Sequence, residues 1–127
     1  MLFSNQKPGT ILSILLFALL LLTSFSGFSQ NRKKPKFKVI AFYTAQNDQA
    51  HISYVHEANK WFPKIAAENH FEYDSTSNWD NLNAKYLAQY QVVLFLDTRP
   101  EKKEQREAFQ KYMENGGGFI GFHFSAF

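Results

Sequence analysis

The pattern of apolar and polar positions divides the chain into short buried strands that alternate with helices. Continuous apolar runs within residues 37–44 and 91–98 are typical of strands that are covered on both faces. Shorter runs within residues 70–76 and 119–124 predict two further strands. Strands that alternate with helical crossovers predict an α/β fold with a mainly parallel sheet. A three-layer, flavodoxin-like arrangement with strand order 2-1-3-4 is favoured, and a Rossmann order is the alternative.

Three helices are predicted between these strands. Apolar residues recur at helical spacing over residues 54–66, and the stripe that they form includes Trp61, which is expected in the core. A short helix is expected within residues 78–90. The third helix is expected to have Pro100 in its first turn and to end where Gly116 can adopt a left-handed conformation. Its expected buried stripe consists of Ala108, Phe109, Tyr112 and Met113.

The first residues have the features of a secretory leader. The apolar run from Ile11 to Leu22 is shorter than the roughly 20 residues that a membrane-spanning helix needs. Gly27 and Ser29 occupy the −3 and −1 positions of a possible cut before Gln30. This pattern predicts a signal peptide over residues 1–29 and a periplasmic or secreted protein without membrane attachment; an uncleaved N-terminal anchor is the alternative. The chain contains no cysteine, so an exported form would have no disulfide bonds.

Charge is distributed unevenly along the chain. The formal net charge is +3, but five basic residues cluster between Arg32 and Lys38. From Val39 onward the chain contains 8 Lys and Arg residues and 11 Asp and Glu residues, which gives this part a net charge of −3. Residues 30–36 are therefore interpreted as a basic lead-in. No nucleic-acid partner is expected, because the remainder of the chain repels phosphate.

Polar side chains follow the predicted strands at their carboxyl ends, where open parallel sheets bind ligands. The candidates are Tyr43 and Thr44 after the first strand, Asp97, Thr98 and Arg99 after the third, and His123 in the fourth. On a helical wheel, His51 falls on the sheet-facing side of the first helix, whereas His56 falls on the solvent side. Tyr43, Thr44, Thr98 and Arg99 are the candidate substrate-binding residues.

These candidates also have structural interpretations. His51 could only close a loop, His123 could be a core histidine, and Asp97 could be a turn cap. If the three converge, they could form a two-histidine, one-carboxylate site for a divalent metal. They could equally serve as general acid and base near a sugar or carbonyl substrate. The spacing favours neither chemistry.

The glycines at 116–118 lie between a predicted helix and a predicted strand. A phosphate-binding loop has the opposite order of strand, glycines and helix. We therefore expect a helix end and a tight turn, and no nucleotide cofactor. Gly121 is expected to permit close packing within its strand. Without cysteine or a G-x-S-x-G motif, nucleophilic catalysis has little support.

Several stretches together resemble the ThuA-like (trehalose-utilisation) family, whose fold is similar to that of class I glutamine amidotransferases. They are the histidine that opens the first helix (His51), the L-x-x-Y-x-V-V-L-F run at 87–95, and the run from Gln105 to His123, which contains G-G-G-x-x-G-x-H. A leader like that of exported members accompanies them. The resemblance covers residues 37–127. It implies a role in sugar utilisation, on trehalose-type disaccharides or their keto derivatives, with His51 and His123 as site residues.

The chain departs from that family after His123. Family members continue past this histidine, so residues 37–127 are expected to be the N-terminal part of an incomplete domain. The fourth strand would then be an exposed edge through which the chain could self-associate. Whether the chain is an enzyme is left open. The alternatives are a non-catalytic carbohydrate-binding module, in which Trp79 could stack on sugar rings, and an inactive gene fragment.

Overall fold

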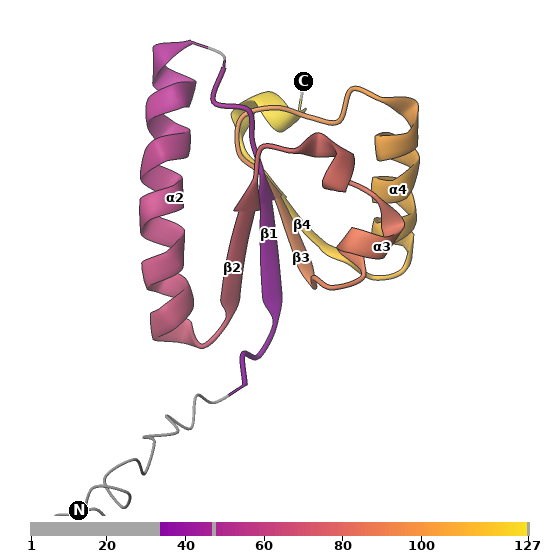
Figure 1. Cartoon of the computed structure of the whole chain (residues 1–127), viewed down its shortest axis with the longest axis horizontal. Helices are drawn as coiled ribbons and strands as arrows, with labels where there is room; N and C mark the ends of the chain where they lie inside the picture. The colour runs from indigo at the N-terminus through magenta and orange to yellow at the C-terminus, as the bar shows by residue number, and fades with distance from the viewer. Residues whose placement is uncertain (1–33, 47, 127) are drawn as a thin grey trace, which may run out of the picture. The chain divides into compact units, whose positions relative to one another are not determined.

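The computed structural model describes residues 34–46 and 48–126, which form a parallel sheet covered by helices on both faces (Figure 1). The predicted signal peptide and residues 30–33 of the basic lead-in lie outside the described residues. Within the described part of the chain, no helix has the length and apolar character needed to cross a membrane.

The sheet has four strands in the order β2-β1-β3-β4, and every neighbouring pair is parallel. The predicted flavodoxin-like order is therefore confirmed. The elements along the chain are β1 (Lys38–Phe42), α2 (Gln49–Asn69), β2 (Glu72–Thr76), η1 (Trp79–Asn81), α3 (Ala84–Leu87), β3 (Val92–Phe95), α4 (Lys103–Glu114), β4 (Gly118–Gly121) and η2 (His123–Ala126).

Alternation along the central strands divides the core into two layers. Val39 and Ala41 of β1 face α2, while Ile40 and Phe42 face the side formed by η1, α3 and α4. All four side chains are buried, which accounts for the continuous apolar run at this strand. The loops at the carboxyl edge thus extend from two buried central strands, β1 and β3, which hold the ends of these loops in place.

The helices near Trp79 differ from their predicted bounds. The short helix expected within residues 78–90 is split into η1 and α3, because the Asn83 side chain caps a new helix by accepting from the backbone N–H of Tyr86 at 3.0 Å. Helix α4 begins at Lys103 rather than at Pro100. Its start is determined by Gln105, which accepts from the Lys102 backbone N–H at 3.2 Å and donates to the Trp79 carbonyl at 2.9 Å.

Two side chains that were expected to be buried are exposed. Trp61 of α2 is 54% exposed and Met113 of α4 is 38% exposed. Both lie at the margin of a helical stripe whose centre is covered, as at Val55 and Ala58 in α2. Helical periodicity identifies the stripe correctly, but the width of the covered part depends on which neighbours are present.

The fourth strand is shorter than predicted. β4 ends at Gly121, and His123 opens the 3-10 turn η2 with a positive φ of 38°. A Cβ at Gly121 would lie 2.5 Å from Ser125 Oγ. The absence of a side chain there therefore lets η2 fold back against the end of the strand and determines where His123 lies.

Replacing Gly117 with alanine is expected to destabilise the protein by about 1–3 kcal/mol. A Cβ at this position would meet the Tyr112 ring at 2.2 Å, so the half-buried ring would have to move. Urea denaturation would measure the loss. The matched control is Gly116→Asn, because Gly116 has φ 86° with no atom within 4 Å of an added Cβ, and asparagine tolerates the left-handed region. Equal losses for the two variants would contradict the steric explanation.

Candidate functional site

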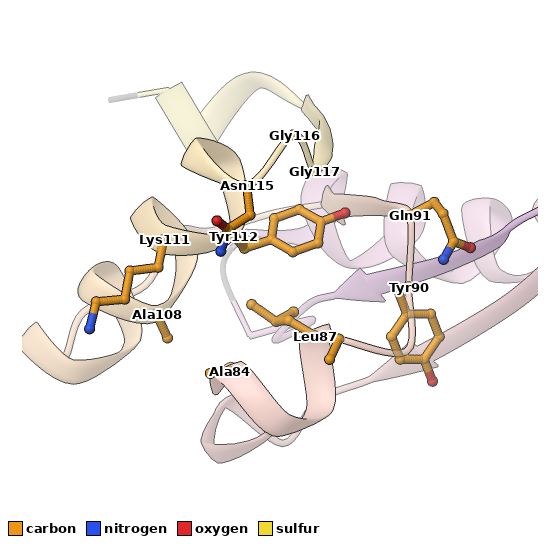
Figure 2. Close-up of a pocket in the computed structure, with 11 residues that line it drawn as sticks. Ala84, Leu87, Tyr90, Gln91, Ala108, Lys111, Tyr112, Asn115, Gly116 and Gly117 are labelled. Carbon is orange, nitrogen blue, oxygen red and sulfur yellow. The ribbon is translucent and has the colours of Figure 1, made fainter.

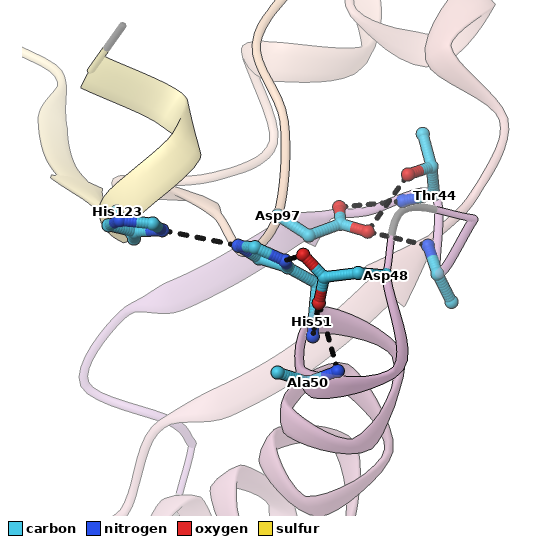
Figure 3. A network of polar contacts seen from close by, with 7 residues as sticks. Thr44, Asp48, Ala50, His51, Asp97 and His123 are labelled. Atoms are coloured by element: carbon cyan, nitrogen blue, oxygen red, sulfur yellow. Dashed lines mark hydrogen bonds and ion pairs between the residues drawn. The ribbon is translucent and has the colours of Figure 1, made fainter.

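A pair of histidines lies at the carboxyl edge of the sheet, one from α2 and the other from η2 (Figure 3). His51 Nε2 lies 3.2 Å from His123 Nδ1, although 72 positions separate the two residues in sequence. The rings are nearly parallel, with centroids 5.4 Å apart and planes at 17°. The Phe124 and His51 rings pack at right angles, with their centroids 4.8 Å apart. The two histidines that were predicted as site residues are therefore in direct contact.

Asp48 holds His51 in place. It is the N-cap of α2, where its Oδ1 accepts from the backbone N–H groups of Ala50 at 2.9 Å and His51 at 3.1 Å. Its Oδ2 lies 2.9 Å from His51 Nδ1. These contacts with His51, the backbone bond foremost, lower the pKa of Asp48 below its usual value. One carboxylate thus both begins the helix and orients the imidazole (Figure 3).

The contacts of His51 determine how protons can be arranged in the pair. A neutral imidazole has one donor and one acceptor nitrogen. His51 Nδ1 lies 2.9 Å from Asp48 Oδ2, but its ring N–H is not aligned for a hydrogen bond. If the nearby carboxylate keeps the proton on His51 Nδ1, then His51 Nε2 accepts and His123 Nδ1 is the donor across the 3.2 Å contact. In that arrangement Nε2 of His123 is an acceptor nitrogen of a relay from Asp48 through His51 to His123. This is the arrangement of an oriented general base.

Asp97 does not join the histidine pair, because its carboxyl group faces the loop after β1. Asp97 is fully buried and accepts from Thr44 N at 2.8 Å, Thr44 Oγ1 at 2.8 Å and Ala45 N at 2.6 Å. Ala45 has a positive φ of 54°, a conformation that costs about 1–2 kcal/mol. The turn-cap interpretation of Asp97 is confirmed, and Asp97 holds the strained loop that leads from β1 to α2.

The metal site that was one alternative for His51, Asp97 and His123 is not assembled from these three residues. Among residues 34–46 and 48–126, no three or more His, Cys, Asp or Glu side chains are grouped so that they could hold a metal ion. The two histidines supply imidazole nitrogens, which suit zinc and similar ions, but the carboxylate beside them is Asp48 and it contacts His51 itself. The geometry fits proton transfer better than metal ligation.

A polar pocket of about 320 Å³ lies on the other side of the same edge, between the loops after β1, β2 and β3. It brings together four predicted site residues: Thr44, Trp79, Thr98 and Arg99. Tyr43 does not line it; its carbonyl accepts from Trp79 Nε1 at 3.1 Å, and its side chain packs on the α2 side of the sheet.

Trp79 contributes to this pocket while packing on the core. Its ring centroid lies 5.3 Å from that of Phe42 and 5.3 Å from that of Phe95. Its indole N–H is bonded to a backbone carbonyl. Trp79 was considered as a residue that could stack on sugar rings, but its neighbours make it a half-buried wall of the pocket rather than a projecting platform.

A second cavity, of about 370 Å³, lies between α3 and α4 at the opposite end of the sheet (Figure 2). Small residues leave this space open, since Ala84, Ala88 and Ala108 face one another there. Tyr112, Gly116 and Gly117 border it. Gly116 N and Gly117 N donate to carbonyls of the last turn of α4, each at 3.0 Å, so these glycines end a helix as predicted.

Asp48, which contacts His51, is the residue of the candidate site that sequence analysis missed. The signal was present, because an Asp that precedes a helix is a common N-cap and its side chain reaches the third residue of the helix. That third residue is His51. The predicted wheel position of His51 is confirmed, with its side chain 13% exposed, and His56 is exposed on the opposite side.

Comparison with other proteins gives one family and one solved structure. A family model described as ThuA, trehalose utilisation, matches residues 38–127. The crystal structure of a ThuA-like protein from Bacteroides uniformis is 37% identical, with a TM-score of 0.70, over 75% of this chain. The match covers 39% of that protein, so this chain spans well under half the length of its relative. No protein with a curated description matches the chain.

Proposed function

Because this chain belongs to the ThuA family of trehalose-utilisation proteins, we propose that it acts in sugar utilisation through general acid–base chemistry at His51 and His123. The substrate class is a trehalose-type disaccharide or its keto derivative. The observation that carries this proposal is the 3.2 Å contact between the two imidazoles at the carboxyl edge of the sheet. Two adjacent groups that can each accept or donate a proton are what such a reaction requires.

The proposed step applies to the keto derivative and is the transfer of a proton next to its carbonyl. The acceptor nitrogen of His123 takes the proton from the carbon beside the carbonyl, and the electron pair of that bond moves toward the carbonyl oxygen. The positive charge gained by His123 is shared with His51 and balanced by Asp48. The same proton can return to the enolate, at either carbon or oxygen, so the step is balanced.

The polar pocket beside Asp97 is the proposed binding site for the remaining sugar hydroxyls. Thr44, Thr98 and Arg99 line it together with other polar side chains. Hydroxyl and guanidinium groups donate and accept in the pattern that a polyhydroxylated ligand needs. Thr44 also touches Asp97, so the pocket is joined to the loop that leads to His51.

Export is proposed from the leader. The apolar run at residues 11–22 and the small residues before Gln30 support a signal peptide over residues 1–29, and hence a periplasmic or secreted location. Mass spectrometry of the protein secreted from a bacterial host would test this. A chain that begins at Gln30 is expected, and an intact leader on the mature protein would contradict the proposal.

Proton NMR with a panel of sugars would test the proposed reaction. The panel contains trehalose, its 3-keto derivative and the parent monosaccharides, and the Bacteroides uniformis relative is assayed in parallel. Loss of the keto-sugar signals, or exchange of the proton beside the carbonyl with deuterium from solvent, is expected. A complete lack of conversion and exchange with both proteins would contradict the proposal.

Asp48→Asn is expected to lower the rate of this reaction by about 100-fold while the thermal midpoint changes little. Asparagine still caps the helix, so the bonds to Ala50 and His51 are kept. The charge beside His51 Nδ1 is lost, and the imidazole is no longer held in one tautomer. NMR turnover and thermal unfolding of the same sample measure the two effects. A fall in stability that matched the fall in rate would indicate a purely structural role.

A second candidate function is sugar binding without turnover, which the polar pocket favours. In that case trehalose should bind with the same affinity to wild type and to His51→Ala, and more weakly to Arg99→Ala. Isothermal titration calorimetry measures all three. Turnover that depends on His51 would contradict this second candidate.

A further inference from the structure

The hydroxyl group of Thr44 is fixed in direction by Asp97 (Figure 3). Asp97 lies just after β3 and is fully buried, and its Oδ2 accepts from Thr44 Oγ1 at 2.8 Å. The same carboxyl group accepts from the backbone N–H groups of Thr44 at 2.8 Å and Ala45 at 2.6 Å. A carboxylate can only accept hydrogen bonds, so the single hydroxyl proton of Thr44 points at Asp97.

The backbone on both sides of this contact is fixed to the sheet. Tyr43 N, next to Thr44, donates to the Thr76 carbonyl at 3.2 Å, and Leu96 N, next to Asp97, donates to the Phe42 carbonyl at 3.0 Å. Ala45, on the other side of Thr44, is held at φ 54° while its N–H is bonded to Asp97. Thr44 and Asp97 therefore keep one relative position, and the Thr44 hydroxyl cannot rotate to suit a ligand.

This fixed direction determines how Thr44 can contact a ligand. Thr44 lines the polar pocket of about 320 Å³. A hydroxyl group has one proton and two lone pairs, and the proton is engaged with Asp97. Thr44 Oγ1 can therefore contact a ligand in the pocket only as an acceptor, and its bond to a charged group makes it a better one. The ligand group at this point must carry a donor, as a hydroxyl does and as a carbonyl or ether oxygen does not.

Arg99 has the opposite requirement. It lines the same pocket and is exposed, and a guanidinium group can only donate. The pocket thus contains one group that must accept and one group that must donate. A ring that carries several hydroxyls satisfies both, because one hydroxyl can donate to Thr44 while the oxygen of another accepts from Arg99.

We propose that Thr44 is a specificity-determining residue, which requires a hydroxyl group of the ligand that donates to it and rejects a carbonyl group at that position. Asp97 acts through Thr44 and is a positioning residue. A site built to bond a substrate hydroxyl discriminates strongly against an analogue that lacks it. This inference rests on the proposed function in taking a sugar as the ligand of the pocket.

The same reasoning assigns the orientation of a keto-sugar. A carbonyl in contact with Thr44 would place its lone pairs against those of Oγ1, with no proton between the two oxygens. The histidine pair lies at the same edge of the sheet, and either imidazole can hold a proton. The keto-sugar therefore binds with its carbonyl toward the histidine pair and with its hydroxyls toward Thr44.

Isothermal titration calorimetry with trehalose and two series of analogues tests the proposal. In one series each hydroxyl of one ring is replaced in turn by hydrogen. In the other series it is replaced by fluorine, which occupies the place of the oxygen but has no proton to donate. At one ring position, both replacements should weaken binding to the wild type by about tenfold, the effect of losing one hydrogen bond.

Two variants show whether Thr44 is the cause. Thr44→Ser keeps the hydroxyl and should keep the discrimination at that ring position. Thr44→Val has the same shape without the hydroxyl and should lose the discrimination. The backbone bonds to Asp97 remain in both variants, and thermal unfolding checks that both fold. The ratio of the two affinities is the readout, because a general disturbance of the pocket weakens trehalose and the analogue alike.

Thr98→Val is the matched control. Thr98 lines the same pocket, and no other described residue accepts a hydrogen bond from its hydroxyl, which can therefore rotate and either donate or accept. This variant should keep the discrimination that Thr44 provides.

Three results would overturn the proposal. They are a wild type for which no replacement weakens binding, a Thr44→Val variant with undiminished discrimination, and a discriminating ring position that is also the carbonyl position of a keto-sugar that reacts. Turnover is measured separately by NMR, so the two proposals can fail independently. Turnover without discrimination would contradict only the role of Thr44, and discrimination without turnover would contradict only the proposed reaction.

Discussion

Replacing His123 with alanine is expected to lower kcat/KM for the keto-sugar substrate by about 10²- to 10⁴-fold, the usual contribution of a general acid or base. In the proposed relay, His123 would accept the proton from substrate, and His51, 3.2 Å away, would share the charge that develops. The side chain is exposed, so the free energy of unfolding should change by no more than about 0.5 kcal/mol. Proton NMR of turnover and urea denaturation measure the two quantities.

His51→Ala should produce a loss of the same order, and the double variant should lose little more than either single variant. When residues act as one unit, the effects of replacing them singly do not add up in the double variant. His56→Ala is the matched control, because His56 lies on the same helix, is exposed and contacts neither site residue in the relay. Full activity in either His51→Ala or His123→Ala, or an equal loss in His56→Ala, would contradict the relay.

Replacing Asp97 with alanine is expected to destabilise the protein by about 3 kcal/mol, because it leaves buried donors without an acceptor. The carboxyl group satisfies Thr44 N, Thr44 Oγ1 and Ala45 N, and its residue is fully buried. Ala45 is held at a positive φ by these bonds. A loss of this size is a large fraction of the stability of a small domain. Urea denaturation would measure it.

A graded pair of variants separates this effect from simple removal of a charge. Asp97→Asn keeps one acceptor oxygen but places an amide N–H₂ group against other donors. It should therefore lower the free energy of unfolding by less than Asp97→Ala does, but by a measurable amount. Asp80→Ala removes an exposed carboxylate whose partner is Lys102 at 2.6 Å, and surface pairs contribute about 1 kcal/mol or less. Equal losses in Asp80→Ala and Asp97→Ala would show that buried hydrogen bonds are not the cause.

The strand order and the layers could be predicted because they follow from local periodicity. Runs such as Val92 to Leu96 are apolar throughout because a central parallel strand is covered on both sides. The alternation with helices then leaves few topologies open. The predicted order 2-1-3-4 is the observed one, and membership of the ThuA family, first indicated by the G-G-G-x-x-G-x-H run, is established over residues 38–127.

Predictions that depended on neighbours were less accurate. Trp61 and Met113 lie on helical stripes, but burial of a stripe's margin requires an element beside it. Helix α4 was expected to start at Pro100 but starts at Lys103, because Gln105 bonds to Trp79, a residue far from it in sequence. In each case a local preference was overridden by a contact that periodicity does not contain.

Sequence analysis predicted that His51 and His123 lie at one edge of the sheet, but it could not predict how the candidate site residues are arranged. His51 and His123 were expected at one edge, and the strand order brings them into contact. Asp97 was expected either as a cap or as a third site residue, and it acts as the cap. The carboxylate that contacts His51 is Asp48 instead. To predict the role of Asp48, one would have to know where α2 begins and in which direction the N-cap side chain of this helix points.

By itself the sequence determined the α/β class, the parallel strand order and the helix end at Gly116, and it singled out the two histidines as candidate site residues. These features depend on the spacing of apolar residues, on the backbone conformations that residues such as glycine allow, and on short sequence motifs. All three are local properties of the chain. Only the tertiary structure decided that the two imidazoles touch, that Asp48 supports them, and that Asp97 binds the Thr44 hydroxyl. Those features depend on distances between residues far apart in the chain, and these arise only when the sheet is assembled.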